Sequence, residues 1–434
     1  MIALPVSGMD LRHDVSSPID NRTLAEWDLS GGTAADAAMI DSFLNDRIGY
    51  RSKAITDYIK LNDDVFGMMI HPIYAYGKEG HVFFKPAYEK VDLDFIDSFC
   101  AFIRQAQDYC EARNVPFIYC LNPSKASIYT DYLPEGYVYR DAFNKAMIEA
   151  LDKYGINYIS NEELMLEKRR TEQVYNKQYD VGHWNDAGCF YGTNNLLKKV
   201  SEYFPSVCEN TEDDFTVVHI KKRSLPGSFF EIYEEIPFYS GNNADQVNNI
   251  SSYYKGIKLN NQHRTYGMME NLMDGSDELP DVLFFKGSYY NKKNKFFETR
   301  FHESYCIHNY ENFIDLDYYF NIFQPDCVIL ETAEYATNAN YFSLQKLKSK
   351  RLNPALSASD ADYKPESIEN YEYSVNIEGS LVEITIDGAD PEKAGFLIIG
   401  DRIFDFIRED DVMSCTIDKE YYDTNMRVCF KELN

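Results

Sequence analysis

Three short apolar runs, far apart in the chain, constrain the fold more than any other feature of the sequence. They cover residues 117–121, 281–285 and 325–331. Runs of this kind are typical of strands that are buried on both faces of a parallel sheet. Patterns with helical spacing lie before and between them, over residues 95–109, 139–154 and 313–323. This alternation predicts an α/β fold, a three-layer α/β/α domain with a parallel sheet.

The chain is long enough for more than one domain. Before the α/β pattern, residues 38–60 have helical spacing interrupted at residues 49–51, and residues 73–84 resemble a hairpin. From Tyr371 onward the hydrophobic period changes to 2, which indicates a small antiparallel β domain. We therefore expect an N-terminal segment on the core, an α/β domain with an insertion, and a β-sandwich-like domain. Their expected bounds are 1–90, 91–355 with the insertion at 205–280, and 366–434. Within the insertion, residues 215–220 are expected to form a strand.

Composition excludes several classes of partner. The net charge is −27, from 70 acidic and 43 basic residues, so the chain repels nucleic acid and anionic membrane surfaces. A neutral or cationic substrate approaches such a chain more easily. No stretch reaches the roughly 20 apolar residues of a membrane span. Either the protein is cytoplasmic, or a leader or anchor is missing from this sequence.

The nine cysteines lie far apart and show no metal-binding spacing, so we expect neither a metal nor a cofactor. Most lie inside apolar runs, which favours buried thiols. Pairing of Cys415 with Cys429 across two late strands is the alternative that we weigh against this interpretation.

Asp180 and His183 are candidates for an acid–base pair. They lie three residues apart, directly before a segment with helical spacing. A catalytic imidazole needs a carboxylate that fixes its tautomer and stabilises its charged form. The alternative is structural, since an Asp near the start of a helix often caps it.

Ser288 is the candidate nucleophile. It follows the apolar run 281–285 and Gly287, and we expect a helix over residues 292–302 after it. A serine at the carboxyl end of a strand projects its hydroxyl at the sheet edge, where backbone N–H groups can receive an oxyanion. The alternative is an ordinary turn residue.

Six short segments resemble the alginate O-acetyltransferase branch (AlgX/AlgJ-like, DHHW-type) of the SGNH-hydrolase-like proteins. They stand in the order expected for that branch, and the resemblance covers residues 17–338. The segments are 20–24 (DNRTL), 45–51 (NDRIGYR), 76–84 (YGKEGHVFF), 123–134 (PSKASIYTDYLP), 183–188 (HWNDAG) and 325–326 (PD). In this branch the acid and the histidine precede the serine, as Asp180 and His183 precede Ser288 here.

The resemblance implies a serine-dependent O-acetyltransferase or acetylesterase that acts on a cell-surface polysaccharide. Ser288 attacks an acyl ester, His183 takes its proton and Asp180 orients the imidazole. The residues expected beside the substrate are Lys125, Trp184 and Tyr289, with a structural role as the alternative for Lys125 and packing under the histidine as the alternative for Trp184. The resemblance also implies an extracytoplasmic protein that takes acetyl from a membrane-bound O-acyltransferase.

Two departures from the branch keep a second interpretation open. The branch usually has one residue between acid and histidine, whereas two separate Asp180 from His183. It also has Asp before the serine, where this chain has Gly287. The second interpretation is therefore a catalytically inactive protein that binds or assembles polysaccharide on the same scaffold.

Overall fold

The computed structural model describes most of the chain, including the segments with the α/β pattern and the period-2 pattern. The described residues are 9, 12, 16–17, 22–26, 37–71, 73–85, 91–225, 230–259, 267–271, 276–360, 363–388, 390, 392–409 and 411–432. Asp20 and Asn21, which begin the first of the six segments, lie outside the described residues.

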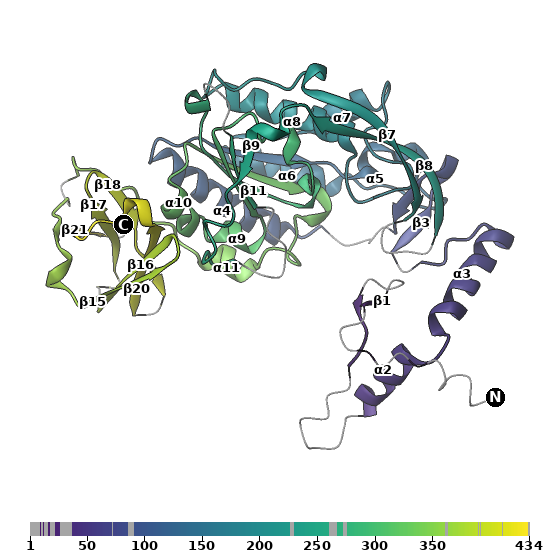
Figure 1. Ribbon diagram of the computed structural model, residues 1–434, viewed down its shortest axis with the longest axis horizontal. Coiled ribbons are helices and arrows are strands. Elements are labelled where there is room, and N and C mark those ends of the chain that lie inside the picture. Colours follow the sequence, from purple (N-terminus) through teal and green to yellow (C-terminus); the bar gives the residue numbers. More distant parts are fainter. Residues whose placement is uncertain are drawn as a thin grey trace.

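A seven-stranded sheet forms the centre of the molecule (Figure 1). The first five strands are parallel, β10 pairs antiparallel with β12, and β9 pairs antiparallel with β10, so the α/β prediction is confirmed. The strands, in spatial order, are β6 (Tyr158–Ser160), β5 (Phe117–Asn122), β13 (Cys327–Ala333), β11 (Val282–Lys286), β12 (Glu303–His308), β10 (Gly267–Asn271) and β9 (Val247–Asn249).

Helices cover both faces of this sheet. Every residue of β5, β11 and β13 is buried, as the apolar runs require. Successive residues of β5 point to opposite layers: the Tyr119 ring meets Phe99, whereas the Cys120 thiol accepts from Asn161 Nδ2 at 3.6 Å. Phe99 belongs to the layer of α4 (Leu93–Glu111) and α6 (Ala142–Tyr154), and Asn161 precedes α7 (Glu162–Lys168), which packs on α8 (Asp186–Ser201).

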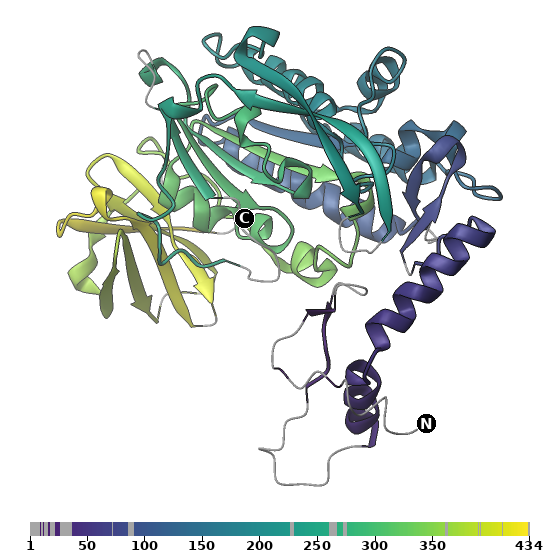
Figure 2. The ribbon, with the colours of Figure 1, turned by 45° about the vertical axis from the view of Figure 1, so that its right-hand side comes forward.

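The described part of the N-terminal segment contains the expected helical region and hairpin, together with a short antiparallel pair of β1 (Ser16–Ser17) and β2 (Arg22–Thr23). Helices α2 (Ala37–Arg47) and α3 (Arg51–Phe66) are separated at Tyr50, whose φ is +63°. The hairpin pairs β3 (Tyr74–Tyr76) with β4 (Val82–Phe84) and packs against the α/β domain, while α2 and α3 extend away from it (Figure 2). Within the described ranges, no helix is long and apolar enough to cross a membrane.

The C-terminal part is an antiparallel β domain, as the period-2 pattern predicts. Two four-stranded sheets share one hydrophobic core, to which both β16 and β17 contribute. One sheet contains β14 (Glu366–Ser367), β21 (Met426–Glu432), β17 (Lys393–Ile399) and β18 (Arg402–Asp405), and the other β15 (Tyr373–Glu378), β16 (Leu381–Asp387), β20 (Val412–Asp418) and β19 (Ile407–Glu409). Cys415 and Cys429 lie in different sheets and both are free. The alternative that they form a disulfide is therefore wrong.

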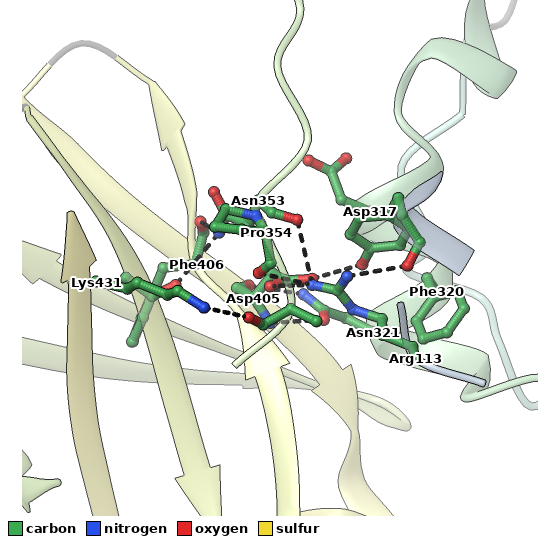
Figure 3. A network of polar contacts seen from close by, with 12 residues as sticks. Arg113, Asp317, Phe320, Asn321, Asn353, Pro354, Asp405, Phe406 and Lys431 are labelled. Carbon is green, nitrogen blue, oxygen red and sulfur yellow. Dashed lines mark hydrogen bonds and ion pairs between the residues drawn. The ribbon is translucent and has the colours of Figure 1, made fainter. Parts of the chain in front are cut away.

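A buried polar network fastens the β domain to the α/β domain (Figure 3). Asp405, at the end of β18, forms an ion pair with Arg113 at 2.9 Å and accepts from the Tyr109 phenol at 2.5 Å. Its backbone exchanges two hydrogen bonds with the amide of Asn321, at 2.8 and 2.9 Å. Because Arg113 also lies 3.7 Å over the Tyr109 ring, the junction is held by charge, hydrogen bonds and packing together.

One local expectation was wrong and two were incomplete. Residues 292–302 form a coiled connection with one short turn, because Phe296 and Phe297 are both buried and Lys292 has a φ of +58°. The helix expected over 313–323 is broken at Asp315, so α9 (Glu311–Ile314) and α10 (Leu316–Phe323) are separate. The insertion contains a long hairpin of β7 (Phe215–Ser224) and β8 (Glu231–Gly241), of which the sequence indicated only the first strand.

Candidate active site

The candidate residues lie on loops at the carboxyl ends of the parallel strands. Ser288 begins a short turn, η6 (Ser288–Tyr290), directly after β11 and Gly287. Tyr335 lies in the turn that follows β13, and Lys125 begins α5 (Lys125–Ile128) after β5. Ligands of open α/β sheets bind along this edge. The loop that enters α8 brings His183 to it, because Trp184 Nε1 donates to the Tyr289 carbonyl at 2.9 Å.

Asp180 and His183 form a hydrogen-bonded pair. Asp180 Oδ1 lies 2.6 Å from His183 Nδ1, and the side chains are 40% and 25% exposed. The pair is tight because Asp180 adopts a φ of +51°, which folds the loop back so that the His183 N–H reaches the Asp180 carbonyl at 3.4 Å. A carboxylate on Nδ1 places the proton there and leaves Nε2 as the basic nitrogen.

The Ser288 hydroxyl has a different partner from the one expected. Its Oγ lies 3.2 Å from the phenol oxygen of Tyr335. Within the part of the chain that the structure describes, Ser288 makes no hydrogen bond to His183, so the alignment of a complete triad stays a prediction. The two loops nevertheless meet, since the His183 ring packs edge-on against Tyr289 with centroids 5.7 Å apart.

The turn at Ser288 presents two backbone donors. Within the described ranges, the N–H groups of Ser288 and Tyr289 have no acceptor, whereas those of Tyr290 and Asn291 bond to the carbonyls of Gly287 and Ser288. Two adjacent free N–H groups beside a nucleophile are what an oxyanion hole requires.

A buried carboxylate holds the backbone directly before the Ser288 turn. Glu331 on β13 is fully buried, and its carboxylate accepts from the Gly287 N–H at 2.6 Å and from Asn122 Nδ2 at 2.8 Å. Burial raises the pKa of Glu331 to about 7, opposed by these hydrogen bonds and by the charge of Lys286. A Cβ at Gly287 would lie 3.0 Å from Asn309 Nδ2 and 3.2 Å from Glu331 Oε2, so a larger residue there would press on both side chains.

The three residues expected beside the substrate are all buried in the structure. Lys125 Nζ donates to the carbonyls of Val82 and Lys177, both at 2.7 Å, and burial lowers its pKa to about 7. Trp184 packs edge-on against Tyr289 and Tyr290, and the Tyr289 phenol donates to the Pro123 carbonyl at 2.6 Å. Buried side chains that bond to the protein itself have little access to a polymer.

Several solved structures are similar to the chain. No family model and no curated protein matches the sequence. The similar structures include Bacillus cereus PatB1 (15% identity, TM-score 0.45, 61% of this chain and 97% of that chain), the O-acetyltransferase domain of Pseudomonas putida AlgJ (14%, 0.45, 64% and 100%) and Pseudomonas aeruginosa AlgX (12%, 0.38, 83% and 95%). The structural neighbours thus include AlgJ and AlgX, to which the sequence motifs are similar.

Tyr335 and Glu331 are site residues that sequence reasoning missed. The loop after the third apolar run is at the expected edge of the sheet, but one tyrosine among many carries no local signal. Glu331 ends an apolar run, where a carboxylate is ordinarily the first exposed residue. Among the described residues, no group of three His, Cys, Asp or Glu is arranged to hold a metal ion.

Proposed function

We propose that this protein is a serine-dependent O-acetyltransferase or acetylesterase that acts on a cell-surface polysaccharide through an acyl-enzyme. The observation that carries the proposal is the 2.6 Å contact between Asp180 Oδ1 and His183 Nδ1, on a loop that touches the Ser288 turn. The free N–H groups of Ser288 and Tyr289 support it, because acyl transfer develops negative charge on the carbonyl oxygen.

The proposed reaction begins with a rotation of the Ser288 hydroxyl from Tyr335 toward His183 Nε2. As Oγ bonds to the acetyl carbon of the donor, its proton passes to Nε2 and the carbonyl oxygen becomes an oxyanion. The N–H groups of Ser288 and Tyr289 hold that oxyanion. Collapse then breaks the bond to the leaving oxygen, which takes the proton from His183 and leaves an acetyl-serine.

The second half of the reaction repeats these steps with a new nucleophile. A sugar hydroxyl or water gives its proton to His183 and attacks the acetyl-serine. Collapse of this second intermediate restores the Ser288 hydroxyl with the proton held by His183. Asp180 stabilises the imidazolium each time that it forms. Transfer and hydrolysis thus differ only in which hydroxyl arrives second.

The proposed setting follows from the resemblance of the motifs and from charge. The acceptor is a polysaccharide, the acetyl group comes from a membrane-bound O-acyltransferase, and the protein acts outside the cytoplasm. The net charge of −27 favours a neutral or cationic glycan over a polyanionic one.

One observation favours the second candidate function, a catalytically inactive protein that binds or assembles polysaccharide. The Ser288 hydroxyl points to Tyr335 at 3.2 Å instead of to the imidazole. If that contact persists when a substrate is present, the serine is not activated and the site is a scaffold only.

Hydrolysis of p-nitrophenyl acetate separates the two functions. We expect the wild-type protein to release p-nitrophenol at least about 100-fold faster than Ser288→Ala, because a triad residue acts as part of one unit. Mass spectrometry of the quenched reaction should find an acetyl group on the peptide that contains Ser288. Equal slow release from both proteins would exclude the enzyme and leave the catalytically inactive, polysaccharide-binding function.

A further inference from the structure

The β7–β8 hairpin reaches from the α8 side of the molecule to the N-terminal hairpin (Figure 1), next to the loop that carries Asp180 and His183. Val181, from that loop, is buried in one apolar cluster with Phe230 and Ile232 of the hairpin and Val82 of β4. The loop is therefore packed between two hairpins, and neither of them contains a residue of the proposed triad.

Glu234 on β8 binds the backbone of this loop directly before the acid. Its carboxylate accepts from three successive N–H groups, those of Lys177 at 2.5 Å, Gln178 at 2.9 Å and Tyr179 at 2.7 Å. The side chain of Gln173 donates a fourth hydrogen bond at 3.0 Å. Charge-assisted bonds of this kind are about twice as strong as neutral ones.

A buried lysine holds the same stretch from its other side. Lys125 Nζ donates to the Lys177 carbonyl at 2.7 Å, and the Val82 N–H donates to the same oxygen at 2.7 Å. Both polar groups of residue 177 are thus fixed, the N–H by Glu234 and the carbonyl by Lys125. The next two peptides, also held by Glu234, lead into Asp180 with its φ of +51°, a conformation that residues with a Cβ rarely adopt.

We propose that Glu234 is a positioning residue, which acts through the backbone of residues 177–179 to hold Asp180 on His183 Nδ1. The catalytic consequence of this inference rests on the proposed function. The contacts of Glu234 with the loop do not depend on that function. It gives the 205–280 insertion a role in the site. Without the carboxylate, three N–H groups lose their acceptor and the left-handed turn at Asp180 loses its support.

The test compares Glu234→Ala and Glu234→Gln with Glu235→Gln. Glu235 is the matched control, because it is the next residue on β8, is exposed and forms a surface ion pair with Lys221 at 3.4 Å. With p-nitrophenyl acetate, we expect Glu234→Ala to lower kcat by about 10- to 100-fold, as small misplacements of reacting groups do. KM should change little, Glu234→Gln should lie between, and Glu235→Gln should match the wild type.

A second readout needs no turnover. In ¹⁵N-histidine-labelled protein, the proton on His183 Nδ1 should give a downfield signal, assigned by its loss in His183→Gln. We expect Glu234→Ala to shift this signal upfield or remove it by exchange, and Glu235→Gln to preserve it, while both variants keep the wild-type melting temperature within a few degrees.

An unchanged Nδ1 signal in folded Glu234→Ala would overturn the positioning role. Failure of the proposed function looks different, since Ser288→Ala would then match the wild type in p-nitrophenol release. The signal would still report whether Glu234 holds the pair.

Discussion

At the scale of single residues, the buried acid Glu331 makes stability depend on pH. Because burial raises its pKa from 4.5 to about 7, the folded protein binds this proton more tightly than the unfolded chain does. Its contribution is therefore complete below about pH 4.5 and is lost as the pH rises through 7, by about 3 kcal/mol at 1.36 kcal/mol per unit. Glu331→Gln should remove this loss.

Urea unfolding at pH 5 and pH 8 measures the difference. We expect the free energy of unfolding to fall more between these values for the wild type than for Glu331→Gln. Glu149→Gln, at an exposed position on α6, is the control and should follow the wild type. The same pH dependence in Glu331→Gln and wild type would contradict the buried state of this carboxylate.

Sequence reasoning selects the residues of the site unevenly at this scale. Asp180, His183 and Ser288 carry a signal, because their types and local spacing suit acyl transfer. Glu331 and Glu234 carry none, since each acts on the backbone of a segment at least 44 residues away. Such contacts depend on the tertiary fold, which one-dimensional spacing does not contain.

At the scale of elements, Trp184 limits which residues α8 can contain, because its ring packs directly against the helix backbone at Gly192. Alanine in place of glycine inside a helix ordinarily adds about 1 kcal/mol of stability. At Gly192, however, a Cβ would lie 2.3 Å from Trp184 Cζ3. We expect Gly192→Ala to lower the free energy of unfolding by about 1–3 kcal/mol, as overpacking does.

Urea unfolding of Gly192→Ala tests whether this substitution destabilises the protein instead of stabilising it. Lys198→Ala, at an exposed position on the same helix, is the control and should stay within about 0.5 kcal/mol of the wild type. Hydrolysis of p-nitrophenyl acetate should also slow in Gly192→Ala, because Trp184 holds the Tyr289 carbonyl at 2.9 Å. A more stable variant would show that Trp184 can move without cost.

Elements were predictable where burial produces a simple pattern. The apolar runs of β5, β11 and β13 predict strands that are covered on both faces, and the structure contains them. The helix expected over 292–302 is absent. Phe297 and Phe301 stand four residues apart and contact each other, as on a helix, whereas Phe296 packs against Phe215 and Tyr239. β8 was missed, since its acidic residues on an exposed hairpin resemble a loop.

At the scale of the whole molecule, the ion pair of Arg113 with Asp405 determines whether the two domains unfold together. Asp405 is 4% exposed, and Arg113→Ala would leave its charge buried without a cation. Breaking a buried pair from one side costs about 3–5 kcal/mol, whereas an exposed pair contributes about 1 kcal/mol or less. We therefore expect Arg113→Ala to be strongly destabilised and Lys348→Ala, which breaks an exposed pair with Asp94, to be nearly neutral.

Scanning calorimetry distinguishes loss of stability from loss of coupling. Because the junction also contains the Asn321 hydrogen bonds and the Tyr109 phenol, we expect one cooperative transition in the wild type. In Arg113→Ala the β domain, which has its own core, should melt separately at a lower temperature than the α/β domain. A single transition at the wild-type temperature in Arg113→Ala would mean that packing alone joins the domains and that the buried charges are dispensable.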